Sequence, residues 1–152
     1  MQQPTPLYLE DYYAGQRFRS AALTVSDAAI AAFLEYDPQV FHRPETAAGT
    51  AFGRVIASGW QTAAYTMRLM VDAGVLPPGG GVGVSAERVR WARPVYPGDA
   101  LYIDAVVEAV RGAPAQQHGF VRFRVRTRNQ FDQEVLSMTT MAMVQRRPPP
   151  LA

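Results

Sequence analysis

Residues 58–74, with the sequence SGWQTAAYTMRLMVDAG, are the stretch that decides the fold of this chain. Ser58 and Gln61 have the spacing of a capping box, in which a hydroxyl at the helix start is matched by an amide three residues later. The apolar residues that follow predict one long helix over residues 59–73, and Gly74 is typical of a C-terminal stop. Because the first two turns carry small residues, this helix can lie close to a second layer of structure.

Strands are predicted after this helix. Their expected ranges are 82–93, 100–111, 119–130 and 133–145. The third strand alternates strictly, with Val121, Phe123 and Val125 on one face and arginines on the other. Such alternation is typical of a half-buried antiparallel sheet.

Two shorter helices are expected before the long one. Ser26 caps a helix that continues to Tyr36, and Pro38 ends it because the residue before a proline is pushed out of the helical region. Pro44 suits the first turn of a second, short helix. Residues 7–24 are predicted to form an extended lead-in.

Helices followed by a run of long antiparallel strands indicate an α+β domain. In this arrangement the 59–73 helix lies across the apolar face of a curved sheet. We expect residues 1–147 to form a single domain and the Pro-rich residues 148–152 to be a frayed tail. The edges of such a sheet have to be covered or paired, which favours a homodimer or a higher homo-oligomer.

The composition is that of a globular protein, with 152 residues, 48% of them hydrophobic and 18% charged. No apolar run approaches the ~20 residues that span a bilayer, and residues 1–6 lack a signal-peptide pattern. We therefore expect a cytoplasmic protein that does not associate with membranes. Without cysteine the chain has no disulfide and no thiol nucleophile.

All fifteen basic residues are arginine, which excludes a Schiff-base lysine. The net charge of +2 gives no reason to expect a nucleic-acid partner. One row of arginines follows the third strand: Arg122, Arg124, Arg126 and Arg128. Two interpretations of this row stay open. It contacts phosphate groups of a ligand, for which guanidinium is well shaped, or it forms a solvated or subunit-facing sheet surface.

Asp37 and His42 are the residues that indicate chemistry. They lie five positions apart, directly after a predicted helix. An aspartate and a neutral imidazole can hold one water molecule and pass its protons. Backbone N–H groups at the start of the long helix, from Gly59 and Trp60, are donors for a developing negative oxygen. A glycine there lets a substrate approach the backbone closely.

This arrangement suits the addition of water to the double bond of a 2-enoyl thioester. Whether Asp37 or His42 acts as the acid is open. Each residue also has a structural alternative: Asp37 as a turn residue, His42 as a hydrogen-bonded structural histidine, Ser58-Gly59 as an ordinary cap and Trp60 as core. The two histidines are distant in sequence and lack acidic partners at ligand spacing, so no metal is expected.

The ordered set of motifs resembles the MaoC-like dehydratase family of hot-dog-fold proteins, which includes the R-specific enoyl-CoA hydratases. The resemblance spans nearly the whole chain. Its residues are Leu9-Glu10-Asp11 with Gly15, Thr24-Val25-Ser26 before Phe33, the Asp37 to His42 spacing, Phe52-Gly53, Ser58-Gly59, Arg93-Pro94-Val95-Tyr96-Pro97-Gly98-Asp99 and Asn129-Gln130.

The resemblance implies a long helix wrapped by an antiparallel sheet, usually in a dimer. It implies that Asp37 and His42 are catalytic and that the Gly59 amide is the oxyanion donor, with Ser58 and Trp60 beside it at the substrate. Two departures from the family pattern stand out. The family has Asn-Pro and an aliphatic residue before the histidine, where this chain has Gln39-Val40-Phe41, and the family's His-Gly is here Ser58-Gly59.

The resemblance therefore implies a hydro-lyase acting on a 2-enoyl-CoA, with no cofactor other than the coenzyme A of the substrate. Two alternatives stay open. One is a hot-dog-fold acyl-CoA thioesterase, which would direct water to the carbonyl. The other is a non-catalytic acyl-CoA-binding subunit, which the departures around the histidine permit.

Overall fold

The structure is a computed structural model, and it describes residues 4–152. Residues 1–3 lie outside the described residues. Two predictions fall partly on them: the start of the expected domain and the lack of a signal-peptide pattern in residues 1–6. No helix within residues 4–152 has both the length and the apolar composition needed to cross a membrane.

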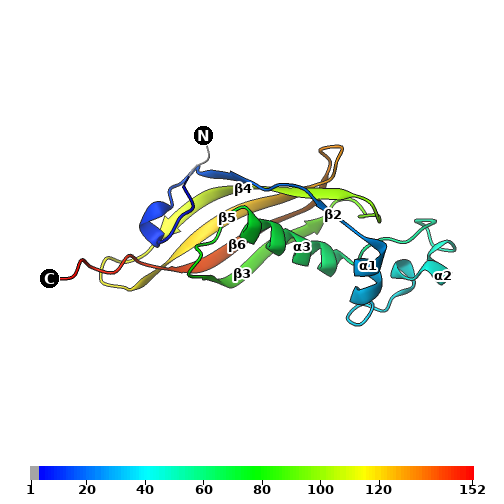
Figure 1. The fold of residues 1–152 in the computed structure, drawn as a ribbon, viewed down its shortest axis with the longest axis horizontal. Coiled ribbons are helices and arrows are strands. Elements are labelled where there is room, and N and C mark those ends of the chain that lie inside the picture. Colours follow the sequence, from blue (N-terminus) through cyan, green and yellow to red (C-terminus); the bar gives the residue numbers. More distant parts are fainter. Residues whose placement is uncertain (1–3) are drawn as a thin grey trace.

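One antiparallel sheet forms the centre of the fold, with strand order β1-β4-β5-β6-β3 and with β2 also paired to β4 (Figure 1). The strands are β1 Arg17–Arg19, β2 Leu23–Thr24, β3 Gly81–Trp91, β4 Ala100–Arg111, β5 His118–Arg128 and β6 Glu134–Gln145. The four long strands agree closely with the predicted ones. The short strands β1 and β2 lie within the predicted extended lead-in, where sequence pattern did not separate them.

The alternation along β5 separates the core from an outer charged face. Val121, Phe123 and Val125 are fully buried. Each arginine of the row on the opposite face lies near a carboxylate of the same face. The pairs are Arg122–Glu108 at 3.2 Å, Arg124–Glu108 at 3.9 Å, Arg126–Glu134 at 3.4 Å and Arg128–Asp104 at 3.3 Å. These ion pairs offset the charge of the row, which favours its interpretation as a sheet surface over that as a phosphate site.

The helices follow the predicted order: α1 Asp27–Phe33, α2 Pro44–Ala47 and α3 Gly59–Asp72, with short 3-10 turns η1 Leu9–Asp11 and η2 Val40–His42. The expected helix to Tyr36 ends earlier, at Phe33. The N–H groups of Leu34 and Tyr36 bond to carbonyls three residues back, at 3.2 and 2.9 Å, so the chain tightens into turns before Pro38.

Helix α3 lies across one face of the sheet (Figure 1). Its buried residues include Leu69, Met70 and Thr66, and the Thr66 hydroxyl lies 2.5 Å from that of Thr127 on β5. Helices α1 and α2 gather at one end of the molecule, near the start of α3 (Figure 1). This end therefore collects the segments that carry Asp37, His42 and Ser58.

Beyond β6, Arg146 and Arg147 pair with Glu10 and Asp11 at 3.2 and 2.7 Å, which ties the last strand to the beginning of the described chain. Residues 148–152 lie in no helix or strand. That they are frayed stays a prediction.

Candidate active site

Asp37 and His42 come together at the end of the molecule where α3 begins. Asp37 follows the turns that end α1, and His42 is the last residue of η2, which turns the chain back. Asp37 Oδ2 lies 3.3 Å from His42 Nε2, and the two side chains are only 15% and 7% exposed. Two groups that are five positions apart in sequence therefore face each other in a largely buried setting.

The segment before α3 is held between two loops. Ile56 N–H donates to Phe41 O at 3.1 Å, and Ala57 N–H donates to Val95 O at 2.8 Å. These bonds place the Ile56 carbonyl against the His42 ring, with 2.7 Å between His42 Nδ1 and Ile56 O. Because a carbonyl only accepts, Nδ1 carries the hydrogen of this bond, and Nε2 is the ring nitrogen that faces Asp37.

Asp37 Oδ2 and His42 Nε2 face each other across 3.3 Å, and the bond from Nδ1 to Ile56 O fixes the orientation of the ring. A carboxylate and an imidazole at this distance can share a proton or pass it from one to the other. The two groups therefore have the geometry of an acid–base pair.

Three neighbours act on the Asp37 carboxyl. Ser58 Oγ–H donates to Oδ2 at 2.6 Å, and Gln39 Nε2 donates to Oδ1 at 2.8 Å. The Ser58 bond is the largest cause of a lowered pKa for Asp37; burial opposes it, and the Gln39 bond and His42 lower the pKa further. Asp37 is thus held as a carboxylate, with both oxygens already engaged.

Ser58 lies at a different point in the site from the one predicted. We expected it among the substrate-contacting residues, yet its side chain is 2% exposed and bonds to Asp37. Its Oγ also accepts from Trp60 N–H at 3.3 Å as the N-cap of α3. The Trp60 amide, expected as a second oxyanion donor, is therefore directed at Ser58. No acceptor among the described residues takes a hydrogen bond from Gly59 N–H, so this amide remains the available donor.

The structure shows why position 59 is a glycine, which the sequence did not show. A Cβ at this position would lie 2.7 Å from Trp91 Nε1, which itself donates to Gly59 O at 2.7 Å. The glycine is required for the close approach of Trp91. That it also lets a substrate approach stays a prediction. Sequence analysis missed Trp91, because no local pattern links the end of β3 to the start of α3.

Two exposed tryptophans flank the helix start. The Trp60 ring is 64% exposed, which rules out the core alternative for this residue, and the Trp91 ring is 42% exposed. The two rings meet edge to face, with their centroids 5.0 Å apart. A hollow of about 350 Å³ beside them includes Gly59, Ile56 and Phe52 in its lining. The candidate oxyanion donor is thus next to a cavity with aromatic walls.

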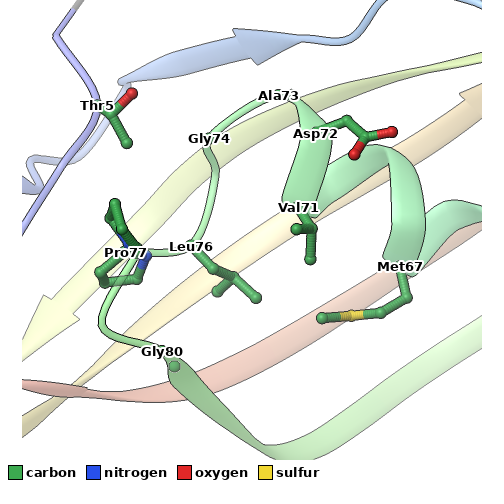
Figure 2. A pocket seen from close by; sticks show the side chains of 11 residues that line it. Thr5, Met67, Val71, Asp72, Ala73, Gly74, Leu76, Pro77 and Gly80 are labelled. Carbon is green, nitrogen blue, oxygen red and sulfur yellow. The ribbon is translucent and has the colours of Figure 1, made fainter.

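A larger hollow, of about 650 Å³, lies at the other end of α3, between Met67, Val71 and the loop around Leu76 and Pro77 (Figure 2). Its one titratable side chain, Asp72, is paired with Arg68 at 3.0 Å. This hollow therefore lacks a free acid–base group. Among the described residues no cluster of three or more histidine, aspartate or glutamate side chains is arranged to hold a metal ion.

A long helix laid on an antiparallel sheet defines a hot-dog-fold protein, and in this chain an aspartate–histidine pair lies at the start of that helix. The chain belongs to the MaoC-like dehydratase family, since the family model described as a MaoC like domain matches residues 13–129. The expected fold and the family resemblance are both confirmed.

Individual relatives agree with this membership. The chain is 30% identical over 141 residues to the uncharacterized protein YdeM of Bacillus subtilis (strain 168), covering 91% of this chain and 99% of that protein. The crystal structure of a MaoC-like dehydratase from Rhodospirillum rubrum has a TM-score of 0.86 and 40% identity, covering 95% of this chain and 100% of that one. The R-hydratase PhaJ1 from Pseudomonas aeruginosa has a TM-score of 0.75 at 22% identity, with 96% of each chain covered, and shows the common fold.

Proposed function

We propose that this protein is a hydro-lyase that reversibly adds water to the double bond of a 2-enoyl-CoA. Its family supports a hydratase or dehydratase role. The observation that carries the finer proposal is the Asp37–His42 pair, 3.3 Å apart, beside a helix start whose Gly59 N–H has no acceptor among the described residues.

In the proposed reaction, the pair takes one proton from water while the water oxygen bonds to the β-carbon. The electrons of the double bond then form an enolate whose charge lies on the thioester oxygen, and Gly59 N–H donates to that oxygen. The proton held by the pair passes to the α-carbon, which completes the addition and restores the site. Atoms and charge balance without a further reactant.

We assign the transient proton to His42 Nε2. Ser58 and Gln39 hold Asp37 in its charged form, which makes the carboxylate a weak proton acceptor. An imidazolium at His42 would then face that carboxylate at 3.3 Å, and Nδ1–H would stay on Ile56 O. Asp37 thus orients water and stabilises the charged ring.

The proposal predicts that Asp37→Asn and His42→Ala each lower kcat/KM by about 10²-fold to 10⁴-fold, the usual contribution of acid–base catalysis. The measurement is the loss of enoyl-thioester absorbance, with parallel thiol detection, on short, medium and branched 2-enoyl-CoA substrates. Asp72→Asn, which changes an exposed carboxylate at the far end of α3, is the control and should keep the wild-type rate.

Thiol release in place of simple absorbance loss would replace the proposal with the thioesterase alternative. Binding without turnover across the whole panel would replace it with the acyl-CoA-binding subunit.

We also propose that the protein is a homodimer formed along β3. This strand pairs only with β6 within the described chain, so its outer edge carries unpaired backbone groups. Val82 and Val84 on β3 are 59% and 49% exposed, and Val71 on α3 is 54% exposed. A second copy would pair the edge and cover these apolar side chains.

A further inference from the structure

The arginines of the described chain fall into two groups. Most lie within ion-pair distance of a carboxylate, as the row on β5 does. Others have no carboxylate that close among the described residues. These are Arg54, Arg88, Arg90 and Arg93, together with Arg17 on β1 and Arg111 at the end of β4. Two of this second group, Arg54 and Arg93, lie in segments next to the start of α3.

Arg54 and Arg93 line one hollow, of about 430 Å³, which the loop that follows β3 also lines. The Arg54 guanidinium stacks on the Tyr96 ring, 3.5 Å from its centroid. Arg93 donates to Glu134 O at 3.0 Å. Each contact orients a guanidinium, but neither supplies a negative charge. The buried Asp99 carboxylate also lines this hollow, but it accepts from Tyr96 N–H at 2.9 Å and from Gln130 Nε2 at 3.0 Å and forms no ion pair with either arginine. Two guanidinium groups therefore face the hollow against one carboxylate that is already hydrogen-bonded.

The hollow lined by Arg54 and Arg93, called the basic hollow below, adjoins the one lined by Gly59, because Arg93 and Pro94 line both. A ligand whose reacting carbonyl lies at Gly59 could therefore continue past Arg93 to Arg54. Phe131, which is 72% exposed, also lines the basic hollow. Two adjoining hollows are thus lined by the candidate oxyanion donor, two guanidinium groups and an exposed aromatic ring.

We propose that this basic hollow binds the nucleotide end of the CoA thioester, with Arg54 and Arg93 as phosphate contacts and Phe131 as a stacking surface for the base. The inference rests on the proposed function. Guanidinium groups match phosphate oxygens in a two-pronged geometry, and aromatic rings stack on bases. A carrier-protein thioester presents a single phosphate and no base, which would leave Phe131 and one arginine unused.

The test compares two substrates in Arg54→Gln and Arg93→Gln variants. 2-Butenoyl-CoA carries the nucleotide, and 2-butenoyl-pantetheine carries the same reacting group without it. We expect each variant to raise KM for the CoA substrate by about tenfold, the cost of one lost charge-assisted contact, with little change in kcat. KM for the pantetheine substrate should stay the same. Arg124→Gln, which removes a paired arginine on β5, is the matched control and should change neither value.

An equal rise in KM for both substrates, or no rise for either, would overturn the proposal. So would an arginine dependence seen with a carrier-protein thioester and not with 2-butenoyl-CoA. Calorimetry with desulfo-CoA separates this inference from the proposed function. If the wild-type protein hydrates neither substrate, tenfold weaker desulfo-CoA binding in Arg93→Gln still supports the basic hollow, and absence of binding overturns it.

Discussion

At the scale of single residues, Ser58 has the most unexpected position. Its hydroxyl donates to Asp37 at 2.6 Å while its oxygen accepts from the first turn of α3 at 3.3 Å. One side chain therefore both caps the helix and sets the charge state of the neighbouring carboxyl. The MaoC-like pattern has a histidine here, so this chain reaches its charged aspartate with a neutral donor.

Replacing Ser58 by alanine should raise the pKa of Asp37 toward its ordinary value of about 3.9. Because the folded-state pKa is lowered, the bond stabilises the fold fully above the unfolded value and loses its effect as the pH falls through the folded value. The destabilisation caused by Ser58→Ala should therefore be larger at pH 7 than at acidic pH. Denaturant unfolding at both pH values, with NMR titration of the carboxyl, measures this.

Ser26→Ala is the matched control for that experiment. Ser26 also caps a helix and accepts from Ala29 N–H at 3.1 Å. Among the described residues, its hydroxyl donates to no carboxylate. It should cost about 1 kcal/mol at either pH, the usual cost of a lost N-cap. If Ser58→Ala shows the same pH-independent cost, the coupling of Ser58 to Asp37 is wrong.

At the scale of elements, the start of α3 is positioned by the end of β3. Trp91 donates to Gly59 O and packs against Gly59 Cα, so the last residue of the strand supports the first residue of the helix. The buried hydroxyl contact between Thr66 and Thr127 holds the same helix to β5 further along. The Gly59 N–H therefore has a defined direction because two strands hold the helix that carries it.

Gly59→Ala should destabilise the protein by about 1–3 kcal/mol, because the new Cβ would meet the Trp91 ring at 2.7 Å and force it away. The same displacement should lower hydratase activity by moving the helix start. Denaturant unfolding and the absorbance assay measure the two effects. Gly79→Ala, whose Cβ would meet nothing within 4 Å, is the control and should be close to neutral. Wild-type stability in Gly59→Ala would contradict the assigned role of Trp91.

At the scale of the whole molecule, the long strand β3 forms one edge of the sheet and pairs only with β6 among the described strands. The outer face of β5 is covered by ion pairs, and its inner face is buried under α3 and the core. Strand β3 has most of its length exposed, although it is as long as its neighbours. An exposed edge strand of this length, with Val82 and Val84 in its first half, is the feature that association with a second copy would remove.

Val84→Lys should therefore weaken the proposed dimer, since it places a charge in the surface that a second β3 would cover. We expect the wild-type protein to run at twice the mass of one 16.7 kDa chain in light scattering after size exclusion. The protein concentration below which the dimer dissociates should be at least tenfold higher for the variant than for the wild type. Leu7→Lys, at a 53% exposed apolar residue away from β3, is the control and should stay dimeric. A monomeric wild type would refute the dimer.

Local patterns in the sequence were enough for the long strands, the long helix and the spacing of Asp37 and His42. Alternation along β5 follows from the period of a strand, and the helix start follows from capping chemistry, so both depend on neighbouring residues alone. The expected helix to Tyr36 was too long because, before a proline, turns whose N–H groups bond to carbonyls three residues back compete with a helix. This competition leaves no periodic signal in the sequence.

What the sequence by itself determined is the order of elements, the α+β class and the two side chains that face each other across η2. Three features were decided by the tertiary structure alone. They are the hydrogen bond from Ser58 to Asp37, the close packing of Trp91 on Gly59, and which arginines lack a carboxylate within ion-pair distance. The physical reason is distance along the chain. Ser58 and Asp37 are 21 residues apart, Trp91 and Gly59 are 32 apart, and Arg122 and Glu108 on the sheet face are 14 apart. Only the packing of strands and helix brings such segments together.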